Sequence, residues 1–192
     1  MKNENKKNKR GKKFMATRAR IGIVQKSGRV IAAYQHWDGY PGGLGYNLCE
    51  HWSSTKKVTD AIKLGDSSKW HYIIGNKIGF DERENPMHEV QNVYYGRDRE
   101  EKGCGYKVYK DEAEYLSNGW NSGEQYLYLF KDVGSKDYLG KPVGTWFYAE
   151  SRYTSEGKEV IDKTFKELEE AAIKDHIEIL NRHLEQKNRM VA

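Results

Sequence analysis

The stretch that decides the fold is Ala33-Tyr-Gln-His-Trp-Asp-Gly-Tyr-Pro-Gly-Gly-Leu-Gly-Tyr-Asn-Leu-Cys-Glu-His-Trp52. Residues 30–34 at its start are β-branched, small or aromatic, which predicts a strand. Leu44, Leu48 and Trp52 recur at helical spacing, which predicts a helix with one face in the core. Between them lies a turn with four glycines, and polar aromatic residues precede it. We therefore predict the site at residues 36–45.

The residue types of this turn favour binding of an anion. Glycine permits positive φ and close approach of a ligand, and the start of the next helix leaves N–H groups unpaired. We predict that a phosphate lies against Gly42, Gly43 and Gly45. Neighbouring side chains add ring faces and hydrogen-bonding groups, namely His36, Trp37, Asp38 and Tyr40. The alternative is an ordinary tight connection, which also uses Gly, Pro and Asp.

A second candidate is the triplet Arg97-Asp98-Arg99, which follows a strand predicted for residues 90–95. Arginine donates two parallel hydrogen bonds to phosphate or carboxylate. If this strand neighbours the glycine turn, Arg97 and Arg99 would face the ligand and neutralise its charge. The alternative is a solvated charge run that pairs with itself.

The rest of the chain predicts an α+β fold, with a mostly antiparallel sheet of about five or six strands. Two short helices on one face follow the second strand, the second of them beginning at Ser53–Thr55 and ending at Gly65. The other predicted strands cover residues 18–24, 124–130 and 144–149, with short candidates at 70–74 and 106–109. Residues 75–89 and 132–143 are predicted loops, and 110–118 a short helix stopped by Gly119.

Three segments are predicted along the chain: a disordered Lys-rich tail over 1–14, the α+β domain over 15–153, and a long C-terminal helix within 154–192. An apolar stripe predicts that this helix runs from Val160 to Met190, with His176 and His183 on its surface. Such a helix is about 45 Å long, more than a small domain can cover. Its distal end is therefore expected to fray or to pair with another subunit in a homo-oligomer.

Charge and composition limit the partners. The first thirteen residues hold seven basic residues and one acidic residue, a net of +6, whereas the whole chain is +5. The basic character therefore belongs to the tail, which predicts at most a weak, salt-sensitive attraction to nucleic acid. Fourteen tyrosines and five tryptophans can fill a core, and they also suit a pocket that stacks rings.

No apolar run approaches the roughly 18–20 residues that span a bilayer, and no secretory signal is recognisable. We expect a soluble intracellular protein without membrane contact. Two cysteines without CxxC spacing indicate neither a disulfide framework nor a zinc site. We predict no metal and no cofactor.

The chain resembles a family of small, mostly uncharacterised proteins of tailed bacteriophages. The similarity covers about residues 16–150. It rests on Ala16-Thr-Arg-Ala-Arg-Ile-Gly-Ile, Tyr34-Gln-His-Trp-Asp-Gly-Tyr-Pro-Gly-Gly-Leu-Gly with Leu48 and His51, Ala61-Ile-Lys-Leu-Gly-Asp-Ser-Ser68, Tyr95-Gly-Arg-Asp-Arg-Glu100 and the late aromatic strands. The His-Trp-Asp-Gly-Tyr-Pro signature is the specific part. The resemblance implies a bacteriophage origin and an accessory role, in host takeover or against host defence, in the cytoplasm of the infected bacterium.

Three functions are open on these grounds. The first is sequestration, without chemistry, of a small anionic, nucleotide-derived ligand such as an immune signalling molecule, with Trp37 or Tyr40 stacked on a base. The second is a phosphodiester or nucleotide hydrolase or transferase, with His36 and Asp38 as acid/base partners or, with His51 and Asp66, as metal ligands. The third is an interaction module that binds a host protein or nucleic acid through the tail and the last helix. We favour the first.

Overall fold

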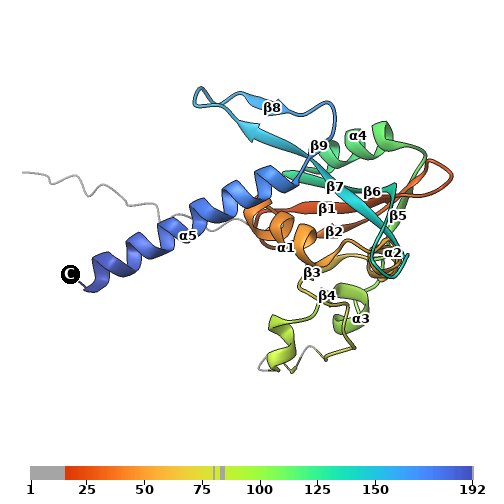
Figure 1. The fold of residues 1–192 in the computed structure, drawn as a ribbon, viewed down its shortest axis with the longest axis horizontal. Helices are drawn as coiled ribbons and strands as arrows, with labels where there is room; N and C mark the ends of the chain where they lie inside the picture. The colour runs from red at the N-terminus through yellow and green to blue at the C-terminus, as the bar shows by residue number, and fades with distance from the viewer. Residues whose placement is uncertain (1–15, 80, 83–84, 192) are drawn as a thin grey trace, which may run out of the picture.

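The computed structural model describes residues 16–79, 81–82 and 85–191, so the predicted tail over 1–14 lies outside the described residues. Its centre is a mixed sheet with the strand order β4-β3-β2-β1-β6-β7-β8, to which β5 is added at β2 and β9 at β7 (Figure 1). The strands are β1 Ala19–Val24, β2 Val30–Gln35, β3 Ser67–Lys69, β4 Val93–Tyr94, β5 Lys107–Tyr109, β6 Tyr126–Lys136, β7 Pro142–Tyr153, β8 Glu159–Ile161 and β9 Lys166–Glu167.

Seven helical segments accompany the sheet within the described residues. They are the π-helix η1 Pro41–Gly45, α1 Tyr46–His51, α2 Thr55–Lys63, the 3-10 helix η2 Pro86–Glu89, α3 Tyr95–Arg99, α4 Glu112–Ser122 and α5 Glu169–Val191. The predicted ends of the second helix are confirmed. Ser54 Oγ accepts the N–H of Lys57 before α2, and Gly65 follows α2 with a φ of 89°.

The α+β class and the long C-terminal helix are confirmed, but the prediction of five or six mostly antiparallel strands is wrong. The described sheet has nine strands, and β1 runs parallel to β6 and β2 parallel to β3. For β2 and β3 the cause is the connection between them, which contains η1, α1 and α2 and returns the chain in its original direction. A helical crossover of this kind joins parallel strands, whereas a tight turn joins antiparallel ones.

Helices cover both faces of the sheet. Leu48 of α1, Val58 of α2 and Leu168 near the start of α5 belong to one buried cluster, together with the inward side chains of β1 and β6. Tyr115 of α4 belongs to a second cluster on the other face, with Leu127 and Leu129 of β6. Alternate residues of β6 therefore enter different cores, as the period of a strand requires.

Several predicted boundaries are wrong. Residues 70–74 form no strand, and β3 instead precedes them at Ser67–Lys69. Much of the loop predicted over 132–143 is a continuation of β6 and β7. Gly119 lies inside α4 rather than stopping it. Its role is close packing, since a Cβ there would lie 2.4 Å from Leu127 of the sheet. Gly123, with a φ of 78°, ends α4.

The C-terminal helix begins at Glu169, not at Val160. The residues before it form β8 and β9, both paired with β7. Phe165 packs in the core that contains Tyr115, whereas Leu168 packs in the core on the other face of the sheet. The chain therefore crosses from one face to the other between these residues, and their helix-like spacing does not come from a helix. Beyond the sheet, α5 extends away from the domain (Figure 1). None of the helices among the described residues has an apolar stretch long enough to cross a bilayer.

Candidate functional site

The candidate site begins where the chain leaves β2. The N–H of His36 donates to Ser67 O (3.2 Å) and the N–H of Trp37 to Ser68 O (3.0 Å), which continues the pairing with β3 beyond the end of β2. Asp38 follows with a φ of 57°, a left-handed conformation that aspartate tolerates better than most residues. The chain turns here, and the side chains of Trp37 and Asp38 are left exposed.

Buried contacts fix the next part of the turn. The N–H of Gly39 donates to Thr17 O (2.9 Å), and the hydroxyl of Tyr128 donates to Gly39 O (2.8 Å). A Cβ at Gly39 would lie 2.4 Å from Thr17 O, so only glycine fits. The turn is therefore a rigid support for the exposed side chains beside it.

The N–H groups of the glycine turn already bind acceptors of the chain itself. The predicted phosphate would therefore have to compete with these acceptors. The N–H of Gly42 donates to Asp175 Oδ2 of α5 (2.7 Å), a carboxylate that the chain itself supplies. The next three N–H groups bond within the turn, in the pairs Gly43 with Tyr40 O (3.1 Å), Leu44 with Asp38 O (2.8 Å) and Gly45 with Tyr40 O (3.3 Å). These backbone donors hold the fold together, and a ligand would have to use side chains instead.

Gly42 is the point at which α5 is seated. A Cβ at Gly42 would lie 2.7 Å from backbone atoms of Asp175 and His176. The Nδ1 of His176 donates to Gly42 O (2.9 Å), and its ring stacks on Tyr46 with centroids 4.0 Å apart and planes 3° apart. The prediction that His176 is a surface residue is wrong, because this half-buried ring fastens α5 to the turn.

A groove of about 680 Å³ lies between the turn, residues 69–72 and α5. Five of the predicted site residues line it, namely Trp37, Asp38, Tyr40, Gly42 and Gly43. Trp37 is 45% exposed and Tyr72, which also lines the groove, is 47% exposed, so both can offer a ring face to a planar ligand. Lys69 adds a positive charge.

Four side chains that line this groove contain a buried polar atom with no hydrogen-bond partner among the described residues. They are Gln35 Oε1, Asn47 Oδ1, Trp70 Nε1 and His71 Nε2. Buried polar atoms are nearly always paired in proteins, and each exception requires an explanation. Trp70 Nε1 can only donate, whereas the two amide oxygens can only accept. The residues that line the groove therefore contain unpaired polar atoms of both kinds.

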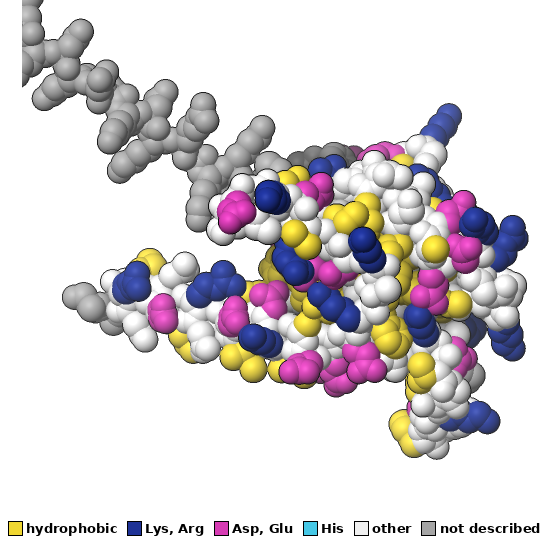
Figure 2. All heavy atoms as spheres, turned by 90° about the horizontal axis from the view of Figure 1, so that it is seen from above, with side chains coloured by type: hydrophobic (Ala, Val, Ile, Leu, Met, Phe, Trp, Pro, Cys, Tyr) yellow, Lys and Arg dark blue, Asp and Glu magenta, His cyan; other side chains and the backbone are white. Residues whose placement is uncertain are grey.

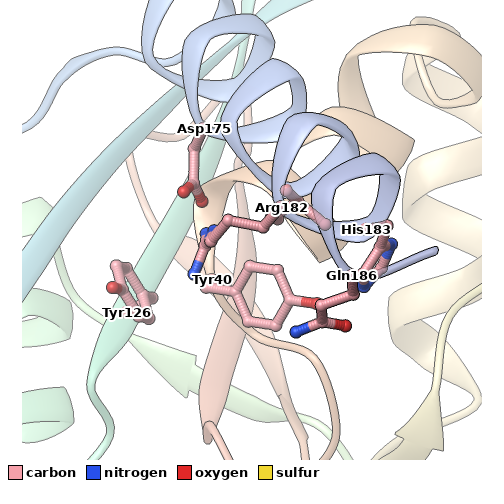
Figure 3. Close-up of a pocket in the computed structure, with 7 residues that line it drawn as sticks. Tyr40, Tyr126, Asp175, Arg182, His183 and Gln186 are labelled. Carbon is pink, nitrogen blue, oxygen red and sulfur yellow. The ribbon is translucent and has the colours of Figure 1, made fainter. Parts of the chain in front are cut away.

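A second cavity of about 450 Å³ adjoins the groove and shares Tyr40 and Ile179 with it. Figure 3 shows Arg182 reaching from α5 into the space near Asp175 and Tyr40, with Tyr126 on the opposite wall. His183 also lines this cavity, from an exposed position on α5. The two hollows together follow the signature turn and the part of α5 from Asp175 to Gln186.

His36 is a hydrogen-bonding group rather than a positive charge. Its Nδ1 lies 2.7 Å from the hydroxyl of Tyr34, and its ring meets that of Trp37 edge-on at 4.7 Å. Partial burial lowers the pKa of His36, and the positive charges of Arg18 and Arg99 lower this pKa further. The imidazole is therefore neutral at pH 7.

The two arginines of the triplet have different environments. Every donor of Arg97 is used: Nε and Nη2 bind the Asp98 carboxylate (2.8 and 3.0 Å), and Nη1 and Nη2 bind the carbonyls of Ile74, Gly75 and Asn92 (3.0, 3.0 and 2.7 Å). The ligand role predicted for Arg97 is therefore not supported by its contacts. The alternative of self-pairing is right for Arg97 and Asp98, but the pair is buried rather than solvated.

Arg99 lies near Trp37 but does not line the groove of the glycine turn that it was predicted to face. Its guanidinium stands 5.0 Å from the ring centre of Tyr95, and its charge acts on His36. Together with Trp37 and Lys69 it lines a third hollow, of about 280 Å³, whose lining among the described residues includes none of α5. The predicted strand over 90–95 is only Val93–Tyr94, because the Asp98 carboxylate accepts the N–H of Tyr94 (2.7 Å) and the chain turns into α3.

The catalytic alternative finds little support in this geometry. Among the residues that the structure describes, no three His, Cys, Asp or Glu side chains are placed to share a metal ion, so His36, Asp38, His51 and Asp66 do not form the proposed ligand set. Asp66 instead accepts the N–H of Tyr34 (2.8 Å). His36 bonds to Tyr34 rather than to Asp38.

Sequence reasoning missed several groups that complete the site. Asn47, Lys69, Trp70 and His71 line the groove, and Asp175 holds Gly42. Their signal was weak: Trp70 and His71 began a segment interpreted as a short strand, and Asp175-His176 was a polar pair on an otherwise ordinary helix. Comparisons of this chain with protein-family models, with curated proteins and with solved structures give no match.

Proposed function

We propose that this chain binds a small, anionic, ring-bearing ligand of the nucleotide class in the groove beside Trp37 and holds it without chemistry. The observation that carries this proposal is that four side chains lining one groove each contain an unpaired, buried polar atom. Ring faces at the groove suit a base, and a shift of these side chains toward the groove would present donors and acceptors to its polar edge. Ligand sites in proteins combine such apolar walls with a few convergent polar groups.

Charge at the site comes from side chains, not from the glycine turn. Lys69 lines both hollows that meet at Trp37, and Arg99 lines the second of them. An anionic group on the ligand can therefore lie beside Trp37 and between these cations. Asp38 lines the groove and Asp175 lines the adjoining cavity, so the anionic group of the ligand is expected to lie away from these two carboxylates.

The biological role follows from the sequence resemblance. We propose that the chain is an accessory protein of a tailed bacteriophage, acting in the cytoplasm of the infected bacterium on a nucleotide-derived signal such as one used in host defence. A binding protein of this kind needs a preorganised pocket but no acid/base pair, and the neutral, Tyr34-bonded His36 fits that requirement.

The first experiment identifies the ligand. Protein purified from bacterial cells is heat-denatured, and the released small molecules are measured by mass spectrometry for wild type, Trp37→Ala and the control Tyr138→Ala. Tyr138 is 94% exposed on the distant β6–β7 hairpin, so the control removes an aromatic ring without touching the groove. Wild type and the control should release the same unmodified nucleotide, and Trp37→Ala much less of it. Equal release from all three proteins, or none from wild type, would overturn the proposal.

The second experiment measures affinity by calorimetric titration with the released nucleotide. Loss of a stacking ring in Trp37→Ala should weaken binding by about 10- to 100-fold. Lys69→Ala should weaken it by about tenfold and reduce its dependence on salt, whereas Lys26→Ala, in the exposed β1–β2 turn, should change neither. Conversion of the nucleotide to a new product during incubation would instead identify a hydrolase or transferase.

A further inference from the structure

The outer face of α5 has an apolar stripe that the domain does not cover. Ile173, Ile177, Leu180 and Leu184 are 41%, 51%, 48% and 58% exposed. They follow one another at intervals of four, three and four residues, which is the spacing of a coiled-coil seam. Figure 2 shows hydrophobic side chains along one edge of the projecting helix.

The domain holds a different face of the same helix. Leu168 and Ala172 are fully buried, and Asp175 and His176 are bonded to Gly42. Residues 180–190 are all exposed. The helix is thus already formed and anchored at its start, so a partner on the outer stripe would have little chain to order.

The charges beside the stripe are complementary to themselves in one orientation only. Glu169 and Glu170 lie one turn before Ile173, and Lys187 lies one turn after Leu184. The wider segments agree: residues 169–178 contain four acidic side chains and one lysine, and residues 179–191 contain three basic side chains and one glutamate. Parallel pairing of two such helices would place like charges together, whereas antiparallel pairing places each acidic half beside a basic half.

We propose that α5 pairs with α5 of a second copy of this chain as an antiparallel two-helix seam. Ile173 of each copy lies opposite Leu184 of the other, and Ile177 opposite Leu180. In this register Glu170 faces Lys187 at both ends of the seam. The partner is a second copy because the stripe and its flanking charges are complementary to the same sequence running in the opposite direction. This proposal is independent of the ligand proposed for the groove.

Sedimentation equilibrium of the full chain tests the pairing. Wild type should be a dimer, and the double variant Ile177→Glu with Leu180→Glu should be a monomer. At a protein concentration low enough for wild type to dissociate, the two proteins should unfold at the same temperature. The matched control is Val133→Glu with Leu139→Glu, which places two acids at comparably exposed apolar positions on the β6–β7 hairpin and should remain a dimer. A monomeric wild type, or a stripe variant that stays dimeric, would overturn the proposal.

Two further measurements test the antiparallel direction. In a background with Cys49→Ala and Cys104→Ser, a mixture of Ile173→Cys and Leu184→Cys proteins should form the mixed disulfide in preference to either homodimeric one. Glu170→Lys should weaken the dimer by about tenfold, and Lys187→Glu should restore it in the double variant. Homodimeric crosslinks at both positions, or a double variant as weak as the single one, would contradict this arrangement.

Discussion

The short helix α3 and the groove at Trp37 have similar sequence signals but use their polar groups in opposite ways. In α3 the Arg97–Asp98 pair is buried, and all five guanidinium donors bind atoms of the chain. Among the residues that line the groove, Gln35 and Trp70 contain unpaired polar atoms, and Trp37 is half exposed. Clusters of arginine, glycine and aromatic residues therefore do not distinguish a structural element from a binding site. An inventory of their hydrogen bonds does.

The largest effect is expected for substitution of Arg97. Arg97→Ala leaves the Asp98 carboxylate buried without its partner and frees three backbone carbonyls, so we expect a loss of about 3–5 kcal/mol in the free energy of unfolding. Urea denaturation measures this loss. Arg29→Ala, at an exposed position in the β1–β2 turn, is the control, with an expected loss below about 1 kcal/mol. Equal stability of the two variants would mean that Arg97 is not the structural arginine.

A change at Gly42 would sharpen the distinction between turn and ligand cradle. Gly42→Ala places a Cβ 2.7 Å from the backbone of α5, so the helix must shift, and we expect a loss of about 1–3 kcal/mol. Relative to wild type, hydrogen exchange of the variant should be faster in α5 and unchanged in α2. Gly105→Ala, which has open space around its Cβ, should leave both the stability and the exchange unchanged. If hydrogen exchange of α5 is unchanged in Gly42→Ala, Gly42 is not needed to seat α5, and its predicted role as a ligand contact stands.

The smallest effect concerns pH and His36. Because burial lowers the pKa of His36 in the folded chain, the unfolded chain binds more protons as the pH falls below about 6.5, and stability is lost on acidification through that range. His36→Gln removes this contribution, so its stability should fall less between pH 7 and 5.5, by a few tenths of a kcal/mol after solvent screening. Urea titrations at both pH values measure it.

His183→Gln is the control for this pH dependence, because His183 is exposed on α5 and should follow wild type. Burial also lowers the pKa of His71, but that contribution is present in all three proteins and cancels in the comparison. An identical acid dependence of wild type and His36→Gln would show that His36 gains or loses no protons on folding in this range.

The sequence predicted well whatever depends on neighbouring residues. Strand β2, the helix of Leu48 and Trp52, the cap at Ser54 and the stop at Gly65 follow from local pattern and turn chemistry. Part of the lining of the candidate groove was also among the predicted residues, because Trp37, Asp38 and Tyr40 crowd a turn that needs few of them. What failed locally was Gly119, since a glycine that permits close packing looks the same in sequence as one that ends a helix.

The sequence by itself therefore determined the α+β class, the long final helix and part of the lining of the candidate groove. Only the tertiary structure decided that β1 and β6 are parallel, that Arg97 is consumed by the fold, and that Asp175 occupies the glycine turn. Each of these depends on residues more than twenty positions apart, such as Gly42 and Asp175. Their pairing is selected by the folded arrangement as a whole, which a local pattern does not contain.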